Sequence, residues 1–148
     1  MSFLQRIFGR APAAPLPPME DTVLGRLTWD ADSEGWTGTI PYGHGTARLH
    51  IGAGSSQQYP SELILRLLRE PYENFPQLVE NALVFLPENM DLRAWKADAS
   101  RFTVEGLESY DHYLADEAYT VTFTHGKDEA IWKVHFKNLQ PTGCGVDG

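Results

Sequence analysis

The chain has 148 residues, 42% of them hydrophobic, and a formal net charge of −8 at pH 7. A domain of this size can bury enough apolar surface to fold without a disulfide or a structural metal. The acidic balance disfavours general nucleic-acid binding, because that affinity comes mostly from neutralising phosphates. It favours a basic protein as partner, since opposite charges steer association. The lone cysteine, Cys144, has no partner for an internal disulfide and fits the reducing environment of the cytoplasm.

Residues 1–10 are predicted to form a short amphipathic helix. Its apolar face carries Phe3, Leu4, Ile7 and Phe8. So short a helix is marginal in water, and we expect this face to contact the protein itself, a partner or a membrane surface. Residues 11–20 are predicted to be a Pro/Ala-rich linker, and residues 21–148 a single α+β domain.

Three predicted strands follow in close succession: residues 23–30, 35–41 and 46–51. In each of them, apolar and polar side chains alternate with the period of two that a half-buried strand requires. Short turns that are polar or contain glycine separate the strands. This pattern is typical of an antiparallel meander with one apolar and one polar face.

Residues 60–86 carry a helical pattern, with apolar side chains recurring every three or four positions. Ser61 is a suitable N-cap. Pro71 is expected to end or kink the first helix, because proline removes a backbone donor and clashes with the preceding turn. Pro87 is expected to stop the second. The segment therefore predicts two helices, or one broken helix, lying against the sheet.

The chain then returns to strands. A turn over residues 91–97 is expected to bury Leu92 and Trp95. Three further strands are predicted at residues 101–105, 118–125 and 130–137. Residues 141–148 are rich in glycine and predict either a short edge strand or a tail.

Strands, helices and strands in this order predict an α+β fold. We expect an antiparallel sheet of about six strands. The two helices, or the one broken helix, are inserted between strands three and four. They pack on one face of the sheet and leave the other face open.

Three short motifs resemble the start and the last strand of small bacterial domains of unknown function. They are Leu24-Gly-Arg-Leu-Thr-Trp-Asp, Gly35-Trp-Thr-Gly-Thr-Ile and Ile131-Trp-Lys-Val-His-Phe. Some similar domains look like immunity proteins of bacterial toxin systems, and for an acidic domain this resemblance implies a basic toxin as partner. It implies no site residue, because the shared positions look like turn and core positions.

The main candidate for a partner-binding surface is acidic and aromatic. Residues 105–117 gather carboxylates and tyrosines without a Lys or Arg, and such side chains suit contact with a basic partner. The candidates in this stretch are Glu105, Glu108, Tyr110, Asp111, His112, Tyr113, Asp116 and Glu117. The predicted polar face of the sheet adds Arg48, His50 and His135.

We therefore expect a non-catalytic cytoplasmic domain that binds a protein and uses no metal or cofactor. The histidines lack the close pair spacing of a zinc site, and no nucleophile motif occurs. Two alternatives stay open. One is a small hydrolase or metal-dependent enzyme with a site on the polar sheet face, using His50 and His135. The other is a membrane-peripheral protein tethered by residues 2–10.

Overall fold

The computed structural model of the chain describes residues 16–53, 57–110 and 118–148. In these ranges, eight strands form one sheet, accompanied by two α-helices and a short 3-10 helix. The strands are β1 (Met19–Asp21), β2 (Gly25–Asp30), β3 (Gly35–Tyr42), β4 (Gly45–Gly52), β5 (Phe102–Tyr110), β6 (Ala118–His125), β7 (Ile131–Lys137) and β8 (Gln140–Asp147). The helices are α2 (Glu62–Glu73), α3 (Phe75–Asn89) and η1 (Ala99–Arg101).

The strands lie in the sheet in their chain order, from β1 to β8. Each neighbouring pair is antiparallel except β4 and β5, which run parallel. The connection explains the exception, because α2 and α3 carry the chain from the end of β4 back to the end of the sheet where β4 began. The prediction of about six antiparallel strands with helices between strands three and four is therefore wrong. The sheet is mixed, has eight strands, and its helices follow strand four.

The two strands beyond the predicted six lie at the margins of the sheet: β1 was not predicted, and for β8 the sequence allowed a short edge strand or a tail. Strand β1 has three residues, which are too few for an alternation to be recognised. Strand β8 has eight residues, but Gly143 and Gly145 stand where side chains would reveal the period of two. Pairing with neighbours, rather than side-chain pattern, makes these segments strands.

The helical segment forms two helices, and the predicted N-cap Ser61 is in place. Pro71 and Pro87 do not end them, since each helix continues for two residues beyond its proline. Both prolines stand in the last turn of their helix, so only two helical residues follow each of them. The break falls at Asn74, and Pro76 follows in the first turn of α3, where no N–H donor is needed.

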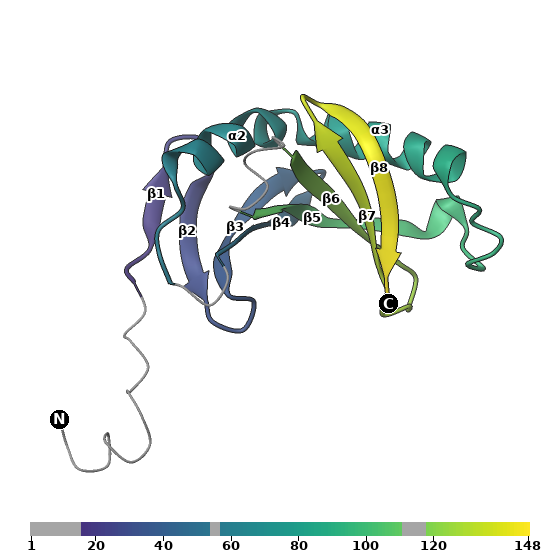
Figure 1. Cartoon of the computed structure of the whole chain (residues 1–148), viewed down its shortest axis with the longest axis horizontal. Helices are drawn as coiled ribbons and strands as arrows, with labels where there is room; N and C mark the ends of the chain where they lie inside the picture. The colour runs from purple at the N-terminus through teal and green to yellow at the C-terminus, as the bar shows by residue number, and fades with distance from the viewer. Residues whose placement is uncertain (1–15, 54–56, 111–117) are drawn as a thin grey trace, which may run out of the picture.

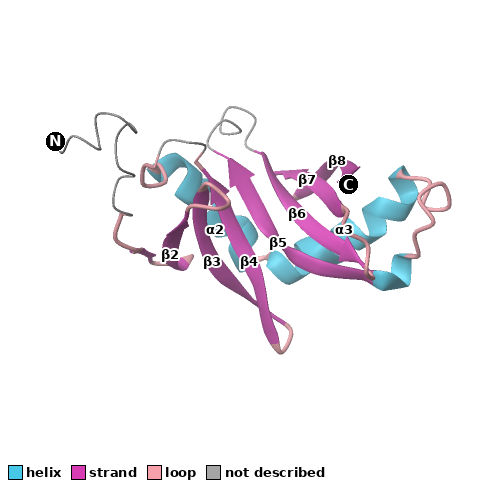
Figure 2. Cartoon of the chain, turned by 90° about the horizontal axis from the view of Figure 1, so that it is seen from below, coloured by secondary structure: helices cyan, strands magenta, loops and turns pink. Residues whose placement is uncertain are grey.

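Both helices cover the same face of the sheet. Seen from below, the central strands cross in front of α2 and α3 (Figure 2), and Figure 1 shows the helices along one side of the curved sheet. The buried core between them takes alternate residues of the strands and the apolar stripes of the helices. It includes Trp36, Leu49, Leu107, Val121 and Val134 from five adjacent strands, all within 1% of complete burial. This burial is the main source of stability.

The prediction that the turn over residues 91–97 buries Trp95 is wrong. Leu92 packs against the core as expected, but Trp95 is 54% exposed. One edge of its ring contacts Trp132 of β7, with the ring centroids 6.0 Å apart. The turn is closed by a hydrogen bond from the Ala97 N–H to the Leu92 carbonyl, which orients Trp95 outward.

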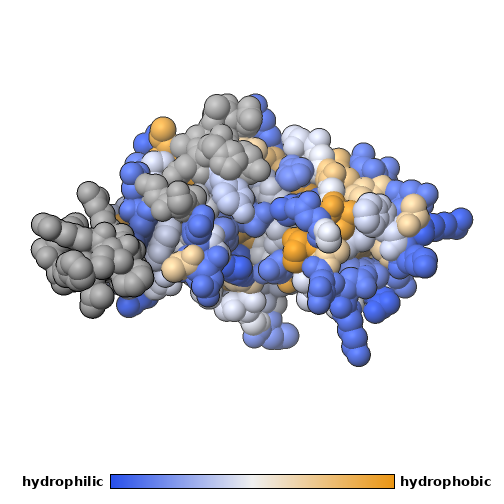
Figure 3. Space-filling view, turned by 60° about the horizontal axis from the view of Figure 1, so that its bottom comes forward, coloured by the Kyte–Doolittle hydropathy of each residue, from blue (hydrophilic) through white to orange (hydrophobic). Residues whose placement is uncertain are grey.

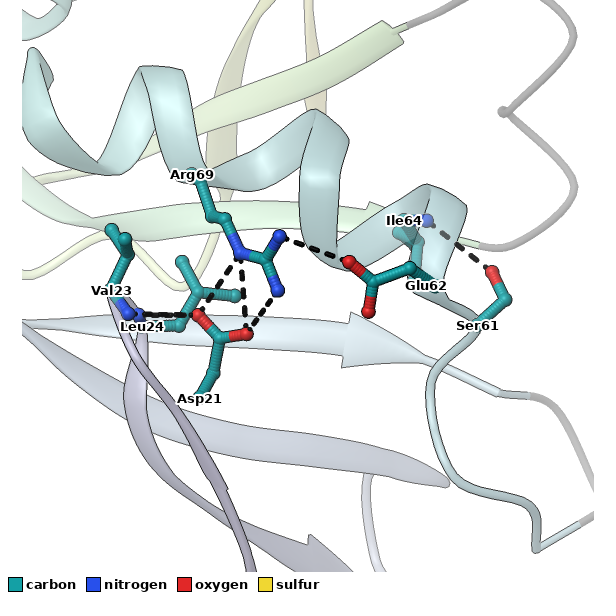
Figure 4. A network of polar contacts seen from close by, with 7 residues as sticks. All are labelled: Asp21, Val23, Leu24, Ser61, Glu62, Ile64 and Arg69. Atoms are coloured by element: carbon teal, nitrogen blue, oxygen red, sulfur yellow. Dashed lines mark hydrogen bonds and ion pairs between the residues drawn. The ribbon is translucent and has the colours of Figure 1, made fainter.

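A buried ion pair ties the first strand to the helical layer (Figure 4). The Asp21 carboxylate accepts hydrogen bonds from Arg69 of α2, the shortest at 2.6 Å, and from the backbone N–H groups of Val23 and Leu24. Arg69 also contacts Glu62 at 3.0 Å. The Asp21 side chain is only 3% exposed. The Arg69 hydrogen bond holds the pKa of Asp21 at about 2, below its ordinary value, despite the opposing effect of burial.

The Asp21–Arg69 pair predicts an acid-sensitive contribution to stability. Asp21→Asn removes the charge and should lower the free energy of unfolding at neutral pH by about 2 kcal/mol. Because the folded-state pKa is depressed, the wild-type advantage is complete above the unfolded pKa near 4 and disappears as the pH falls towards 2. Urea unfolding at several pH values measures both effects.

The matched control for that experiment is Glu80→Gln, which removes an exposed charge from α3. It should leave the free energy of unfolding within about 0.5 kcal/mol of the wild type. Equal stability of Asp21→Asn and the wild type across the pH range would contradict the assigned role of Asp21.

The predicted N-terminal helix, with Phe3, Leu4, Ile7 and Phe8, lies outside the described residues, as do residues 11–15 of the linker. Within the described ranges, each helix is too short or too polar to cross a membrane.

Candidate functional site

We call the face of the sheet turned away from α2 and α3 the open face. Strand register brings five polar side chains into one row across it, from β3 to β7: Thr37, His50, Glu108, Thr120 and His135. Figure 3 is turned towards this side of the molecule, and its described surface is mostly hydrophilic. The open face is therefore the polar sheet face that the alternation of side chains predicted.

A second row runs beside the first on the same face. It consists of Thr39, Arg48, Gly106, Thr122 and Lys133. Thr122 is 4% exposed and donates a hydrogen bond to the Gly106 carbonyl at 3.3 Å. Side chains in the middle of the open face are thus packed against one another, and the exposed groups lie around them.

The predicted acidic stretch does not form one loop. Strand β5 extends to Tyr110, so Glu108 and Tyr110 lie within the sheet, and Glu105 stands at a β-bulge between Val104 and Gly106. The other candidates of this stretch lie outside the described residues: Asp111, His112, Tyr113, Asp116 and Glu117. The structure therefore brings Glu108 together with the sheet-face candidates Arg48, His50 and His135.

His50 is used for packing. It is only 7% exposed, and its ring lies over Gly35, where a Cβ would come within 2.6 Å of Nε2. Burial, followed by the charge of Arg48, lowers the pKa of His50 below its ordinary value, against smaller opposing effects of Ser33 and Asp30. Nε2 has no hydrogen bond of normal geometry in the described part of the chain. His50 is therefore a neutral, covered imidazole rather than a group presented to a partner.

Tyr110 packs in a similar way at the end of β5. Its ring covers Gly52 so closely that a Cβ there would overlap it, and it meets the His50 ring edge-on with centroids 5.8 Å apart. Glycine at position 52 is thus required by the neighbouring tyrosine. The two aromatic rings form a cap over the ends of β3 and β4.

His135 is also engaged within the sheet. Its Nδ1 lies 2.9 Å from the Thr120 hydroxyl on β6. Burial, followed by the charge of Lys133, lowers the pKa of His135. Although His50 and His135 share one row, Glu108 and Thr120 stand between them. The two histidines therefore do not form a pair.

Lys133 lies between two carboxylates on the open face. Its Nζ is 2.7 Å from the Asp147 carboxylate of β8 and 3.7 Å from that of Glu108. The Asp147 hydrogen bond is the main cause of the raised pKa of Lys133. Burial raises the pKa of Glu108, and this effect outweighs the opposing charge of Lys133. Glu108 therefore keeps a carboxylate in a costly, half-buried position.

A shallow open depression of about 560 Å³ lies at the other side of the open face, on β2, β3 and β4. It is lined by Asp30, Thr37, Gly38, Thr39, Thr46, Ala47, Arg48 and Glu105. Arg48 and Asp30 stand 3.6 Å apart, and their side chains remain 44% and 36% exposed. Charges this exposed and loosely paired are available to a partner.

Asp30, Lys133 and Asp147 are charged members of this face that were not among the predicted site residues. Lys133 could have been found, because the alternation of β7 places it on the polar face. Asp30 is the last residue of β2, and its carboxylate accepts hydrogen bonds from Asp32 and Ser33 of the following turn. An aspartate before a turn is expected for structural reasons, so its sequence position did not indicate a binding role. Asp147 lies in the glycine-rich segment that was predicted to be either a short edge strand or a tail, so the sequence did not place it on a face of the sheet.

The open face is suited to polar recognition. In the described part of the chain, no group of three or more His, Cys, Asp or Glu side chains is arranged to hold a metal ion. The Arg48, Asp30 and Asp147 side chains are 44%, 36% and 71% exposed, while Glu108 and Lys133 are 20% and 27% exposed. Such groups can exchange their mutual contacts for contacts with a second charged surface.

Comparisons of this chain with protein families, with curated proteins and with solved structures found no match. The likeness to small bacterial domains therefore stays a prediction. The geometry of the open face is the basis for the function proposed below.

The raised pKa of Glu108 predicts that its effect on the free energy of unfolding changes with pH in the opposite direction to that of Asp21. Its folded-state pKa is raised, so its contribution to stability is complete at low pH and is lost as the pH rises through that pKa. Glu108→Gln should therefore gain stability relative to the wild type as the pH rises above 4.5, the ordinary pKa of a glutamate. Urea unfolding across this range measures the difference, and a variant that loses stability relative to the wild type as the pH rises would contradict it.

The close approach of Gly106 to the Arg48 backbone predicts that a larger residue at position 106 would disturb the pairing of β4 with β5. A Cβ at Gly106 would overlap the backbone carbonyl of Arg48, so Gly106→Ala should lower the free energy of unfolding by about 1–3 kcal/mol. Gly45→Ala is the control, because a Cβ at Gly45 meets only open space. Chemical denaturation of both variants measures the difference. Similar stability of the two variants would show that the strands can separate without cost.

Proposed function

We propose that this protein is a non-catalytic binding domain that recognises a basic protein through its open face. The observation that carries the proposal is the depression beside Arg48, where Asp30 and Glu105 provide carboxylates and the Arg48–Asp30 pair is loose and exposed. A basic side chain of a partner can enter the depression and pair with these carboxylates. Only the loose Arg48–Asp30 contact would have to break.

The charge of the chain supports a basic partner. The formal net charge is −8, and outside residues 1–18 the sequence has ten Lys or Arg against twenty Asp or Glu. Such an excess attracts a basic protein from a distance and raises its association rate at low ionic strength. The exposed groups of the open face then determine the orientation in which the partner binds.

The positions of the histidines favour binding over catalysis. An enzyme that used His50 and His135 would need an accessible imidazole, and His50 is 7% exposed while His135 contacts Thr120. Both pKa values are lowered by burial, as is expected for histidines that pack within a sheet.

The proposed partner and compartment follow from the same charge and composition. An acidic domain that blocks a basic toxin would act as an immunity protein, and such a role agrees with the resemblance of its strand motifs. The single cysteine supports action in a reducing compartment such as the cytoplasm.

Affinity capture of the tagged full-length chain from its native cells, followed by mass spectrometry, tests the proposal. A stoichiometric basic protein is expected, with capture that weakens as salt is added, because exposed charges are screened. Glu105→Lys should weaken the captured complex by about tenfold or more in dissociation constant.

The matched control is Glu80→Lys, which makes the same charge change on α3, on the other side of the sheet. It should leave the affinity within about threefold of the wild type. Equal losses in both variants would assign the effect to total charge rather than to the open face. Capture of no basic protein at low salt would overturn the proposed function.

A further inference from the structure

The two margins of the sheet are built differently. Strand β1 has three residues and is tied to α2 through Asp21 and Arg69. Strand β8 has eight residues and pairs only with β7. Among the described residues, no backbone hydrogen bond reaches the outer side of β8. Figure 1 shows β8, in yellow, with no strand beyond it. Its outer side is therefore a row of backbone donors and acceptors open to another strand.

Strand β8 has one feature that protects such an edge, a β-bulge at Thr142 near its start, and from Gly143 onward it lacks the others. Natural edge strands carry lysines, central prolines or bulky charged groups that prevent pairing. Strand β8 has no Lys or Arg, its single proline is the second residue, and its centre is Gly143, Cys144 and Gly145. A Cβ at Gly145 would meet no atom within 4 Å, so the backbone there is not shielded by neighbours.

The edge is also nearly free of net charge on a strongly acidic protein. Its only charged side chain, Asp147, is bound by Lys133 at 2.7 Å. Two copies of a chain with a net charge of −8 repel each other across most of their surfaces. Along β8 this repulsion is smallest, because the charge is neutralised within each copy and stands at the end of the strand. A basic partner, in contrast, gains little from a neutral edge.

An exposed aromatic side chain lies against β7, the strand that pairs with this edge. Trp95 is 54% exposed and contacts Trp132, which pairs in register with Val146 of β8. Strand pairing alone buries less surface than a stable dimer requires. Tryptophan is the side chain most often found at the energetic centre of interfaces, and Trp95 can add apolar contact at the Asp147 end of the strand.

We propose that β8 pairs antiparallel with β8 of a second copy, about a two-fold axis near the strand centre. The two sheets would then become one continuous sheet of sixteen strands across the dimer. In this arrangement the two Asp147 side chains lie at opposite ends of the shared ladder, and each copy contributes the same surface, as a closed dimer requires. The edge is separate from the depression of the open face, so the dimer does not depend on the proposed function.

Sedimentation velocity of the full-length chain, from low micromolar to several hundred micromolar protein, tests this proposal. We expect a reversible monomer–dimer equilibrium. Gly145→Glu places a carboxylate on each side of the two-fold axis and should raise the dimer dissociation constant by at least tenfold. The monomer should tolerate it, because a Cβ at Gly145 has open space, and the added charge is not compensated because Lys133 already binds Asp147. Trp95→Ala should raise the same constant by about tenfold.

Gly45→Glu is the matched control, since Gly45 also has open space for a Cβ and begins β4 within the sheet. It makes the same change in charge and should leave the dimer intact. Circular dichroism and thermal unfolding confirm that each variant is folded. A wild-type protein that stays monomeric at all concentrations would overturn the proposal, and so would a dimer that Gly145→Glu and Gly45→Glu weaken equally.

Discussion

The parallel pairing of β4 with β5 is the constraint on which the rest of the structure depends. All other neighbouring strands are antiparallel, and this one pair is joined through α2 and α3. The crossover places both helices on one face of the sheet and leaves the other open (Figure 2). Its register aligns Leu49 with Leu107 in the core and His50 with Glu108 on the open face. Core and candidate site therefore arise from the same pairing.

Close packing at this pair explains why several conspicuous polar residues do not face a partner. Gly106 lies against the Arg48 carbonyl, His50 covers Gly35, and the Tyr110 ring covers Gly52. Each glycine provides the space that a neighbouring group fills. The histidine and tyrosine thus pack within the sheet, and the proposed recognition falls to charged groups nearer the margin of the open face. Chemical reactivity of a residue type is a poor guide where burial removes its access to solvent.

The charged groups connect the open face to the free edge. Lys133 stands on β7 and contacts Glu108 of β5 on one side and Asp147 of β8 on the other. It therefore neutralises the edge strand and helps to hold a half-buried carboxylate. The two surfaces differ in chemistry, since one has exposed charges of both signs and the other has mainly backbone groups. The proposed basic partner and the proposed second copy of the chain would therefore occupy different surfaces.

The sequence by itself determined the secondary structure whose pattern repeats over many residues. Alternation identified the strands around Trp36, Leu49 and Val134, and helical periodicity identified the two helices, because burial on one face imposes a period on the side chains. Only the tertiary structure decided the strand number, the parallel pair, the exposure of Trp95 and the burial of His50. Short or glycine-rich strands such as β1 and β8 carry no readable period. Which residues become neighbours across strands depends on register, and register is set by the packing of the whole sheet against α2 and α3.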